Sequence, residues 1–205
     1  MDVTAFIEYI GTIEDETSLI EALNRALLQL GFVAFNYGSG HFTQGGGLIA
    51  DRIWSTLDPN WINYYAANRY YRDDRLVRAS LLSVTPFRYE RIFKTPPTSS
   101  RQREMEKRFG YRSGVVVPIH RFGGDYGVLS AARPNADPQP EIEWPTIASL
   151  QLLATAFHER VRALPLPVKP LSLKIPALML TARERQCLVW ASAGKTNKDI
   201  RASYA

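Results

Sequence analysis

The stretch from residue 61 to residue 89 constrains this chain more than any other, because it concentrates five tyrosines, one tryptophan and two adjacent aspartates. Trp61 and Tyr65 are four residues apart, so on a helix they project side by side from one face. A carboxylate only accepts hydrogen bonds, so Asp74, turned toward these aromatic side chains, would need a donor from outside the chain's own backbone. The stretch predicts either a ligand-binding surface or an aromatic stripe packed into a core, with Asp73 and Asp74 in solvent.

The hydrophobic pattern predicts helices and strands along most of the chain. Residues 16–30 have the spacing of an amphipathic helix, with Gly31 where a C-terminal cap belongs. The glycine-rich residues 38–47 predict a flexible turn. The other predicted elements are strands at 32–37, 47–53, 115–119 and 126–132, and helices at 59–72, 73–83, 99–109 and 141–163. This order predicts an α+β fold, an α/β/α sandwich of about 160 residues with a central antiparallel sheet.

The composition fits a protein with a sizeable core, since 45% of its 205 residues are hydrophobic. No apolar run reaches the roughly 20 residues that span a bilayer, and the acidic N-terminus lacks the basic start and apolar stretch of a signal peptide. These features predict a cytoplasmic protein with no membrane contact. The single cysteine, Cys187, excludes an internal disulfide framework, and His41, His120 and His158 show no metal-ligand spacing. We therefore expect no metal and no cofactor.

Basic residues are concentrated toward the end of the sequence. From Arg160 onwards there are nine Lys or Arg against two Asp or Glu, a balance of +7, so the first 159 residues carry about −2 of the net +5. This asymmetry indicates a nearly neutral domain joined to a segment that meets phosphate groups, although a solvated basic face is the alternative. The four prolines of residues 164–177 predict a semi-rigid linker between the two parts.

Four motifs in this order resemble the LuxR-type quorum-sensing transcriptional regulators. The first is Trp61-x3-Tyr65-x8-Asp74, followed by Pro86 and an aromatic residue at position 89. The others are the segments FGYRSGVVVPIH (109–120), YGVLSA (126–131) and LTARERQCLVWASAGKTNKDI (180–200). The resemblance implies that residues 1–163 form an autoinducer-binding domain with the same α/β/α fold. It also implies that residues 178–205 begin an all-α helix-turn-helix domain.

The resemblance further implies a small-molecule signal, an N-acyl homoserine lactone, and assigns residues to its binding. Trp61 would donate its indole N–H to the lactone carbonyl, and Asp74 would accept from the amide N–H of the signal. Tyr65 would wall the pocket or hydrogen-bond the acyl carbonyl, although packing alone is an equally good interpretation. Ser130 falls where the family has a hydroxyl that lines the pocket, but it could serve only the sheet. Tyr70, in the same aromatic run, is counted with the pocket residues.

Some residues depart from the family pattern and leave the identity of the signal open. Leu57 stands where the family has a tyrosine that holds the acyl carbonyl, Arg75 where a proline follows the aspartate, and Tyr89 where a tryptophan is usual. Leu57 and Tyr89 still count as pocket positions. Each missing hydrogen bond would weaken or redirect recognition by about 1 kcal/mol. Gly110 and Gly114 match family glycines that permit a tight turn and close packing, and Gly110 is also explained as a helix cap.

The tail predicts two helices. Thr181 to Glu184 form a capping-box pattern, Gly194 is placed to end the first helix, and a second helix starts at Thr196. After Ile200 the sequence reads RASYA, whereas a helix-turn-helix domain needs roughly 25 to 30 further residues to place a recognition helix in the major groove. We therefore expect a truncated domain that should not bind an operator specifically on its own.

The leading hypothesis is a quorum-sensing receptor that takes part in transcription regulation as a truncated anti-activator. It would form inactive dimers with a full-length relative, or a homodimer, through the helix at 141–163. The alternatives are a ligand-dependent DNA-binding activator seen in a truncated form, and a ligand-free protein-interaction module. An enzyme is not expected, because the sequence pairs no nucleophile with a histidine base and offers no metal cluster.

Overall fold

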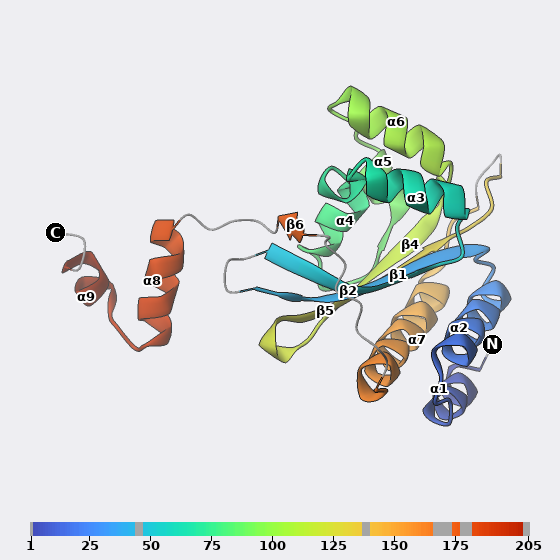
Figure 1. Cartoon of the computed structure of the whole chain (residues 1–205), viewed down its shortest axis with the longest axis horizontal. Coiled ribbons are helices and arrows are strands. Elements are labelled where there is room, and N and C mark those ends of the chain that lie inside the picture. Colours follow the sequence, from blue (N-terminus) through green and yellow to red (C-terminus); the bar gives the residue numbers. More distant parts are fainter. Residues whose placement is uncertain (1, 44–46, 137–139, 166–173, 177–181, 203–205) are drawn as a thin grey trace.

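The computed structural model describes residues 2–43, 47–136, 140–165, 174–176 and 182–202. A single antiparallel sheet lies at its centre with helices on both faces, and the last two helices stand apart from it (Figure 1). The strand order is β3-β4-β5-β1-β2-β6. The strands are β1 (Ala34–Phe42), β2 (Gly47–Ser55), β3 (Phe87–Arg88), β4 (Gly114–His120), β5 (Asp125–Ala132) and β6 (Lys174–Pro176). The predicted α/β/α sandwich with a central antiparallel sheet is confirmed.

Two layers of helices cover the sheet (Figure 1). One layer contains α1 (Val3–Gly11), α2 (Glu16–Gln29) and α7 (Trp144–Ala163). The other contains α3 (Pro59–Ala67), α4 (Arg75–Ser80), α5 (Tyr89–Phe93) and α6 (Ser100–Phe109), with a 3-10 turn at Tyr70–Arg72. The two helices beyond the sheet are α8 (Ala182–Ser192) and α9 (Asn197–Ala202). The sequence pattern predicts neither α1 nor α5, which are short. None of the described helices is long and apolar enough to cross a membrane.

The larger core lies between the sheet and the layer of α1, α2 and α7. Leu19, Leu23 and Leu27 recur every four residues along α2, and all three are fully buried. Phe157 and Val161 of α7 meet them in the same hydrophobic cluster. The predicted amphipathic helix at 16–30 is therefore confirmed, and its apolar stripe fixes this layer on the sheet.

Several helix ends follow the chemistry expected from the sequence. Asp58 accepts a hydrogen bond from the backbone N–H of Asn60 at the start of α3. Ser99 caps α6 through the N–H of Gln102, and Gly110 ends that helix with φ at 78°. These caps fix where the chain enters and leaves the second helix layer.

The predicted flexible turn at 38–47 is wrong for its first part, because β1 continues to Phe42. Glycines in the segment suggested a turn, yet Gly40 has a packing role inside the strand. The register between β1 and β2 shifts at Ser39 and Gly40, and a Cβ on Gly40 would lie 2.2 Å from the carbonyl oxygen of Ile49. Only glycine allows the two backbones to approach this closely.

The aromatic helix is shorter than predicted. It was expected to run to Arg72, but α3 ends at Ala67. Arg69 then adopts φ 53°, in the left-handed region, which ends the helix and leads into the 3-10 turn. The segment expected to be helical at 73–83 is α4, only six residues long, and the helix expected at 141–163 begins at Trp144.

Part of the predicted linker at 164–177 is folded. Lys174–Pro176 form β6, which pairs with β2 at the sheet edge, so the prediction of a semi-rigid linker rather than a folded element is wrong for these three residues. In the tail, Gly194 has φ 79°, and Thr196 and Asp199 form a reciprocal capping pair at the start of α9. The capping box predicted from Thr181 lies outside the described residues.

Candidate ligand-binding site

A cavity of about 190 Å³ lies between the sheet and the layer of α3, α4 and α6. Four of the residues predicted from the sequence line it: Trp61, Tyr65, Asp74 and Ser130. Most of the remaining wall is apolar, with contributions from Leu48, Ala50, Ile53, Ile62, Leu76, Val77, Phe93, Met105, Phe109, Val116 and Val128. A mostly apolar cavity with a few convergent polar groups suits a small amphiphilic molecule.

Three predicted residues lie behind the cavity wall. Tyr70 is 2% exposed and stacks on Trp61, with ring centroids 6.4 Å apart. Leu57 is buried in the hydrophobic cluster beneath the same helix layer. Tyr89 is 1% exposed, and its hydroxyl lies 2.6 Å from Ser130 Oγ. These three side chains support the residues that line the cavity. A change in one of the three would therefore affect a ligand only indirectly, through the lining residues.

Trp61 and Tyr65 lie side by side on α3, as their spacing predicts. Their ring centroids are 5.7 Å apart, in an edge-to-face arrangement. Phe109 of α6 packs against the indole at 6.3 Å. Within the described part of the chain, no acceptor receives a hydrogen bond from the indole N–H. The wall of the cavity therefore includes an indole donor that no described acceptor uses.

Asp74 is held by the chain itself. Its Oδ1 accepts from the backbone N–H of Leu76 at 2.8 Å and caps α4, and its Oδ2 accepts from the Tyr65 hydroxyl at 2.9 Å. The expectation that Asp74 needs a donor from outside the backbone is wrong for Oδ1, because an aspartate directly before a helix meets unpaired N–H groups. A carboxylate oxygen accepts more than one hydrogen bond, so Oδ2 can still receive a ligand donor.

Burial and hydrogen bonding act together on the pKa values of this pair. Burial raises the pKa of Asp74, while the hydrogen bonds from Tyr65 and Leu76 act to lower it. Burial first, and then the charge of Asp74, raise the pKa of Tyr65 well above its usual value. Tyr65 therefore remains a neutral phenol that donates to the carboxylate, and the pair presents an acceptor to the cavity.

Ser130 is fixed by its place in β5 and by its contact with Tyr89. Burial raises the pKa of Tyr89, so this phenol also stays neutral in its contact with Ser130 Oγ. Gly114 makes room for the tyrosine, because a Cβ there would lie 2.5 Å from the Tyr89 ring. The predicted close packing at Gly114 is confirmed, and Gly110 is a helix cap, as its second interpretation stated.

Arg75 has a structural role that the sequence did not reveal. Its Nε donates to Glu106 Oε1 at 2.7 Å, and Nη1 donates to the carbonyl oxygens of Ile92 and Thr95 at 3.0 and 2.6 Å. Glu106 is 6% exposed and lines the cavity. The partners lie 31, 17 and 20 residues away in sequence, so no local pattern could have indicated them.

Arg75→Lys is expected to lower the free energy of unfolding by about 1–2 kcal/mol, because lysine keeps the charge but loses the planar fork and at least one carbonyl contact. Chemical denaturation measures the change. Arg78→Lys, at an exposed position of the same helix, is the matched control and should stay within about 0.5 kcal/mol of the parent. Equal losses in both variants would contradict a specific role for Arg75.

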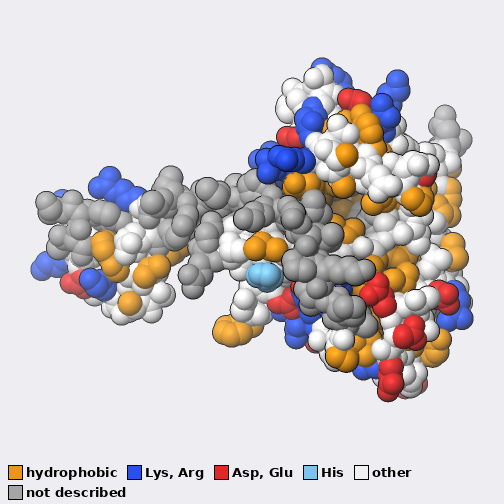
Figure 2. Space-filling view, viewed as in Figure 1, with side chains coloured by type: hydrophobic (Ala, Val, Ile, Leu, Met, Phe, Trp, Pro, Cys, Tyr) orange, Lys and Arg blue, Asp and Glu red, His pale blue; other side chains and the backbone are white. Residues whose placement is uncertain are grey.

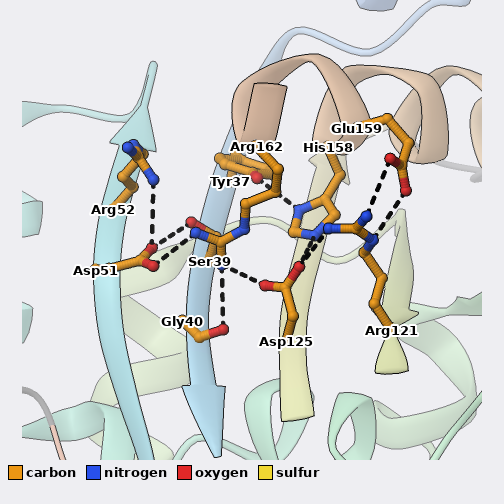
Figure 3. A network of polar contacts seen from close by, with 10 residues as sticks. All are labelled: Tyr37, Ser39, Gly40, Asp51, Arg52, Arg121, Asp125, His158, Glu159 and Arg162. Carbon is orange, nitrogen blue, oxygen red and sulfur yellow. Dashed lines mark hydrogen bonds and ion pairs between the residues drawn. The ribbon is translucent and has the colours of Figure 1, made fainter. Parts of the chain in front are cut away.

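A second polar network lies on the opposite face of the sheet, under α7 (Figure 3). Arg162 Nη1 contacts Asp51 Oδ2 at 2.6 Å, and its Nη2 contacts Asp125 Oδ1 at 2.5 Å. His158 Nδ1 lies 2.7 Å from the Tyr37 hydroxyl. The network joins β1, β2 and β5 to the last turns of α7, and it contains none of the residues predicted for the site.

His158 is expected to make stability depend on pH. Burial lowers its pKa, and this effect outweighs the opposing charge of Asp125. The folded protein therefore holds fewer protons than the unfolded chain, so stability falls as the pH drops below about 6.5, by at most about 1.4 kcal/mol per pH unit. Denaturation between pH 8 and pH 5 should show a shallower slope for His158→Gln. The exposed His41→Gln should keep the parent slope; identical slopes in all three proteins would refute the assignment.

Comparison with known protein families agrees with a ligand-binding role for the domain that contains this cavity. The family model described as the autoinducer binding domain matches residues 15–161, which include α2 to α6, most of α7 and all the residues that line the cavity. The transcriptional activator protein BjaR1 of Bradyrhizobium diazoefficiens is 27% identical over 203 residues, covering 95% of this chain and 78% of that protein. The putative HTH-type transcriptional regulator y4qH of Sinorhizobium fredii is 35% identical over 130 residues, 61% of this chain but only 37% of that protein.

Solved structures share the fold. The crystal structure of Escherichia coli SdiA aligns with a TM-score of 0.68 at 17% identity, covering 98% of this chain and 82% of SdiA. The N-acylhomoserine lactone dependent LuxR family transcription factor CepR2 of Burkholderia cenocepacia aligns at 0.58 and 17% identity, covering 78% of this chain and 92% of CepR2. The matched family model, which covers more than half of the sequence, places this chain in the autoinducer-binding family of LuxR-type transcriptional regulators, signal-responsive proteins that are not enzymes.

Proposed function

We propose that the cavity binds an N-acyl homoserine lactone-like signal. The observation that carries this proposal is the pairing of a free donor with a fixed acceptor. The Trp61 indole N–H has no acceptor within the described residues, and Asp74, whose Oδ2 accepts from the Tyr65 hydroxyl, lines the same cavity. An acyl homoserine lactone has the matching groups, a carbonyl on its ring and an amide N–H next to it. Apolar walls beyond this pair suit the acyl chain.

Each lining residue has a defined task in this proposal. Trp61 donates to the lactone carbonyl and Asp74 accepts from the amide N–H. Tyr65 stays on Asp74 or turns its hydroxyl to the acyl carbonyl, which lies near the amide. Ser130, held by Tyr89, offers a hydroxyl on the floor of the cavity. Leu57 and Tyr70 act only by supporting the wall.

A solved complex of a structural neighbour supports an acylated ligand. SdiA in complex with octanoyl-rac-glycerol aligns with this chain at a TM-score of 0.69, and its ligand joins a polar head to an acyl chain. The same combination of a polar end and an apolar body fits the walls described above. In this proposal residues 1–163 form the sensing domain, residues 164–177 connect it, and residues 178–205 belong to the helix-turn-helix part.

The test is retention of a signal by the purified protein. The 205-residue protein is produced in cells fed a mixture of N-acyl homoserine lactones with different acyl chains, and an organic extract is examined by mass spectrometry. The parent should retain one lactone or a narrow set. Trp61→Phe keeps an aromatic ring but removes the donor, so retention should fall about tenfold.

Trp144→Phe is the matched control, because Trp144 is 66% exposed and lies outside the cavity, over Arg88. This variant should retain as much lactone as the parent. A folded parent protein that retains no lactone would overturn the proposal and favour a ligand-free interaction module.

A finer proposal concerns a polypeptide of residues 1–205 taken by itself. Exposed basic side chains on α8 and α9, visible in Figure 2, can contact phosphates, but phosphate contacts alone do not read a base sequence. We propose that such a polypeptide pairs with a full-length relative and lowers its activity, as an anti-activator. Co-expression of a tagged copy with a full-length relative tests this. Failure to co-purify, or an unchanged reporter signal, would refute it.

A further inference from the structure

The floor of the cavity has a polar group at each end. Tyr126, Val128 and Ser130 alternate on β5, so all three face the cavity. A strand rises about 3.4 Å per residue, which places the Cα atoms of Tyr126 and Ser130 roughly 14 Å apart. Val128 lies between them on β5, and Val116, which pairs with Ser130 from β4, extends the apolar surface. The cavity therefore has a second polar end, remote from Ser130.

Ser80 marks the same remote end on the opposite wall. It follows Asp74 by six residues on α4, and at about 1.5 Å per residue this corresponds to roughly 9 Å along the helix. Ser80 and Tyr126 both line the cavity, and Ser80 Oγ lies 2.6 Å from the Tyr126 hydroxyl. Two separate elements, α4 and β5, thus bring hydroxyl groups together at the end opposite to the Asp74 anchor.

The direction of this hydrogen bond follows from counting protons. Ser80 has one hydroxyl proton, and its Oγ donates to the carbonyl oxygen of Val77 at 2.7 Å. The proton between Ser80 and Tyr126 must then come from Tyr126. The Tyr126 oxygen keeps a lone pair, and within the described part of the chain no other group donates to it. An acceptor without a donor is therefore left at the remote end.

Tyr126 is held firmly in this position. Its ring packs edge-on against Phe42 and His120, with centroids 5.7 and 5.2 Å away. Burial raises its pKa, so it stays a neutral phenol. A phenylalanine would fill the same space without a hydroxyl, and burying a hydroxyl whose oxygen receives no hydrogen bond carries a desolvation cost. Both facts favour a role for this oxygen in selecting what occupies the cavity.

We propose that the cavity selects a signal whose acyl chain carries a hydrogen-bond donor, such as a hydroxyl group, at the end remote from the lactone, and that the Tyr126 oxygen accepts from it. Ser80 positions the tyrosine by accepting the hydrogen bond from its hydroxyl. The inference rests on the proposed function, because the lactone end must be held at Trp61 and Asp74 for the chain to reach Tyr126. The inference adds a requirement on the acyl chain, whereas the proposed function concerns mainly the lactone head.

A matched pair of ligands tests the inference directly. N-octanoyl homoserine lactone and its ω-hydroxyoctanoyl analogue differ only by the terminal hydroxyl, and hexanoyl and decanoyl pairs allow for a different chain length. Each is titrated into the purified protein by calorimetry. At the best length, the hydroxylated ligand should bind roughly threefold to tenfold more tightly than the plain one.

Variants test whether Tyr126 and Ser80 cause the preference for the hydroxylated ligand. Tyr126→Phe should reverse the preference, because the ligand hydroxyl then enters an apolar end without an acceptor. Ser80→Ala should weaken the preference by leaving the tyrosine hydroxyl free to turn. Tyr64→Phe is the matched control, since its hydroxyl donates to Glu104 outside the cavity and its loss should leave the preference unchanged.

The outcomes separate this inference from the proposed function. Equal binding of both members of every pair to the parent protein would overturn the inference and leave lactone binding standing, and this comparison needs no variant. A preference that survives in folded Tyr126→Phe would overturn it as well. If no lactone of either kind binds, the proposed function fails, and the inference fails with it.

Discussion

Asp74→Asn is expected to weaken binding of a retained lactone by about tenfold to a hundredfold. This change in affinity corresponds to the loss of one hydrogen bond to a charged group. The carboxylate accepts from the ligand amide, whereas an asparagine either presents an amide N–H to it or accepts without a charge. Asparagine is as good a helix cap as aspartate, so α4 should still begin at the same place. The substitution therefore tests ligand contact with little effect on the fold.

Asp73→Asn is the matched control for this prediction. The same chemical change is made one residue earlier, at a side chain that is 40% exposed and pairs with Arg101 Nε at 2.6 Å, outside the cavity. Lactone affinity, measured by titration for parent and both variants, should change only for Asp74. Equal affinity for parent and Asp74→Asn would show that this carboxylate serves only the helix and Tyr65.

The part of the site that lies on one helix was predictable from the sequence. Trp61 and Tyr65 are four residues apart, and helix geometry alone places them together. The role of Asp74 as a cap was also within reach, because an aspartate before a helical segment is a common N-terminal signal. The sequence does not separate this capping role from ligand binding, because the same carboxylate is an acceptor in both.

Contacts between distant segments could not be predicted in this way. The Tyr89 and Ser130 hydroxyls are 41 residues apart in sequence, and Ser80 and Tyr126 are 46 apart. Neither pair has a local signature, since each depends on which strand lies under which helix. The resemblance to a family did suggest Ser130, but it gave no reason to single out Tyr126.

The sheet shows the opposite kind of error, where a local signal was clear and misleading. Glycines at 38 and 40 indicated a turn, although β1 runs through both of them. The requirement for glycine comes from the neighbouring strand, whose Ile49 carbonyl occupies the space of a Cβ on Gly40. A turn and a close approach of two strands both favour glycine, and only the structure separates them.

Arg162→Met is expected to cause the largest loss of stability, about 3–5 kcal/mol in the free energy of unfolding. Arg162 is the cation between Asp51 and Asp125. Its side chain is 18% exposed, and those of Asp51 and Asp125 are 11% and 21% exposed. Methionine keeps the length of the side chain but leaves two largely buried carboxylates without this partner. The loss of stability should come from weaker packing of α7 against the sheet (Figure 3).

Arg121→Met provides the control, because Arg121 also pairs with Asp125 but is 38% exposed, and its other partner, Glu159, is 54% exposed. Water screens a pair whose cation is more exposed, so this variant should lose clearly less stability than Arg162→Met.

The pH dependence gives a second readout. Burial alone would raise the pKa of Asp125, but Arg121 and Arg162 outweigh it and the pKa is lowered. The stabilisation is therefore present at neutral pH and is lost as the pH falls and the carboxyl group becomes protonated. The difference between parent and Arg162→Met should shrink in acid. Equal losses for both arginine variants, or a difference that does not change with pH, would show that Arg162 acts through packing rather than through its charge.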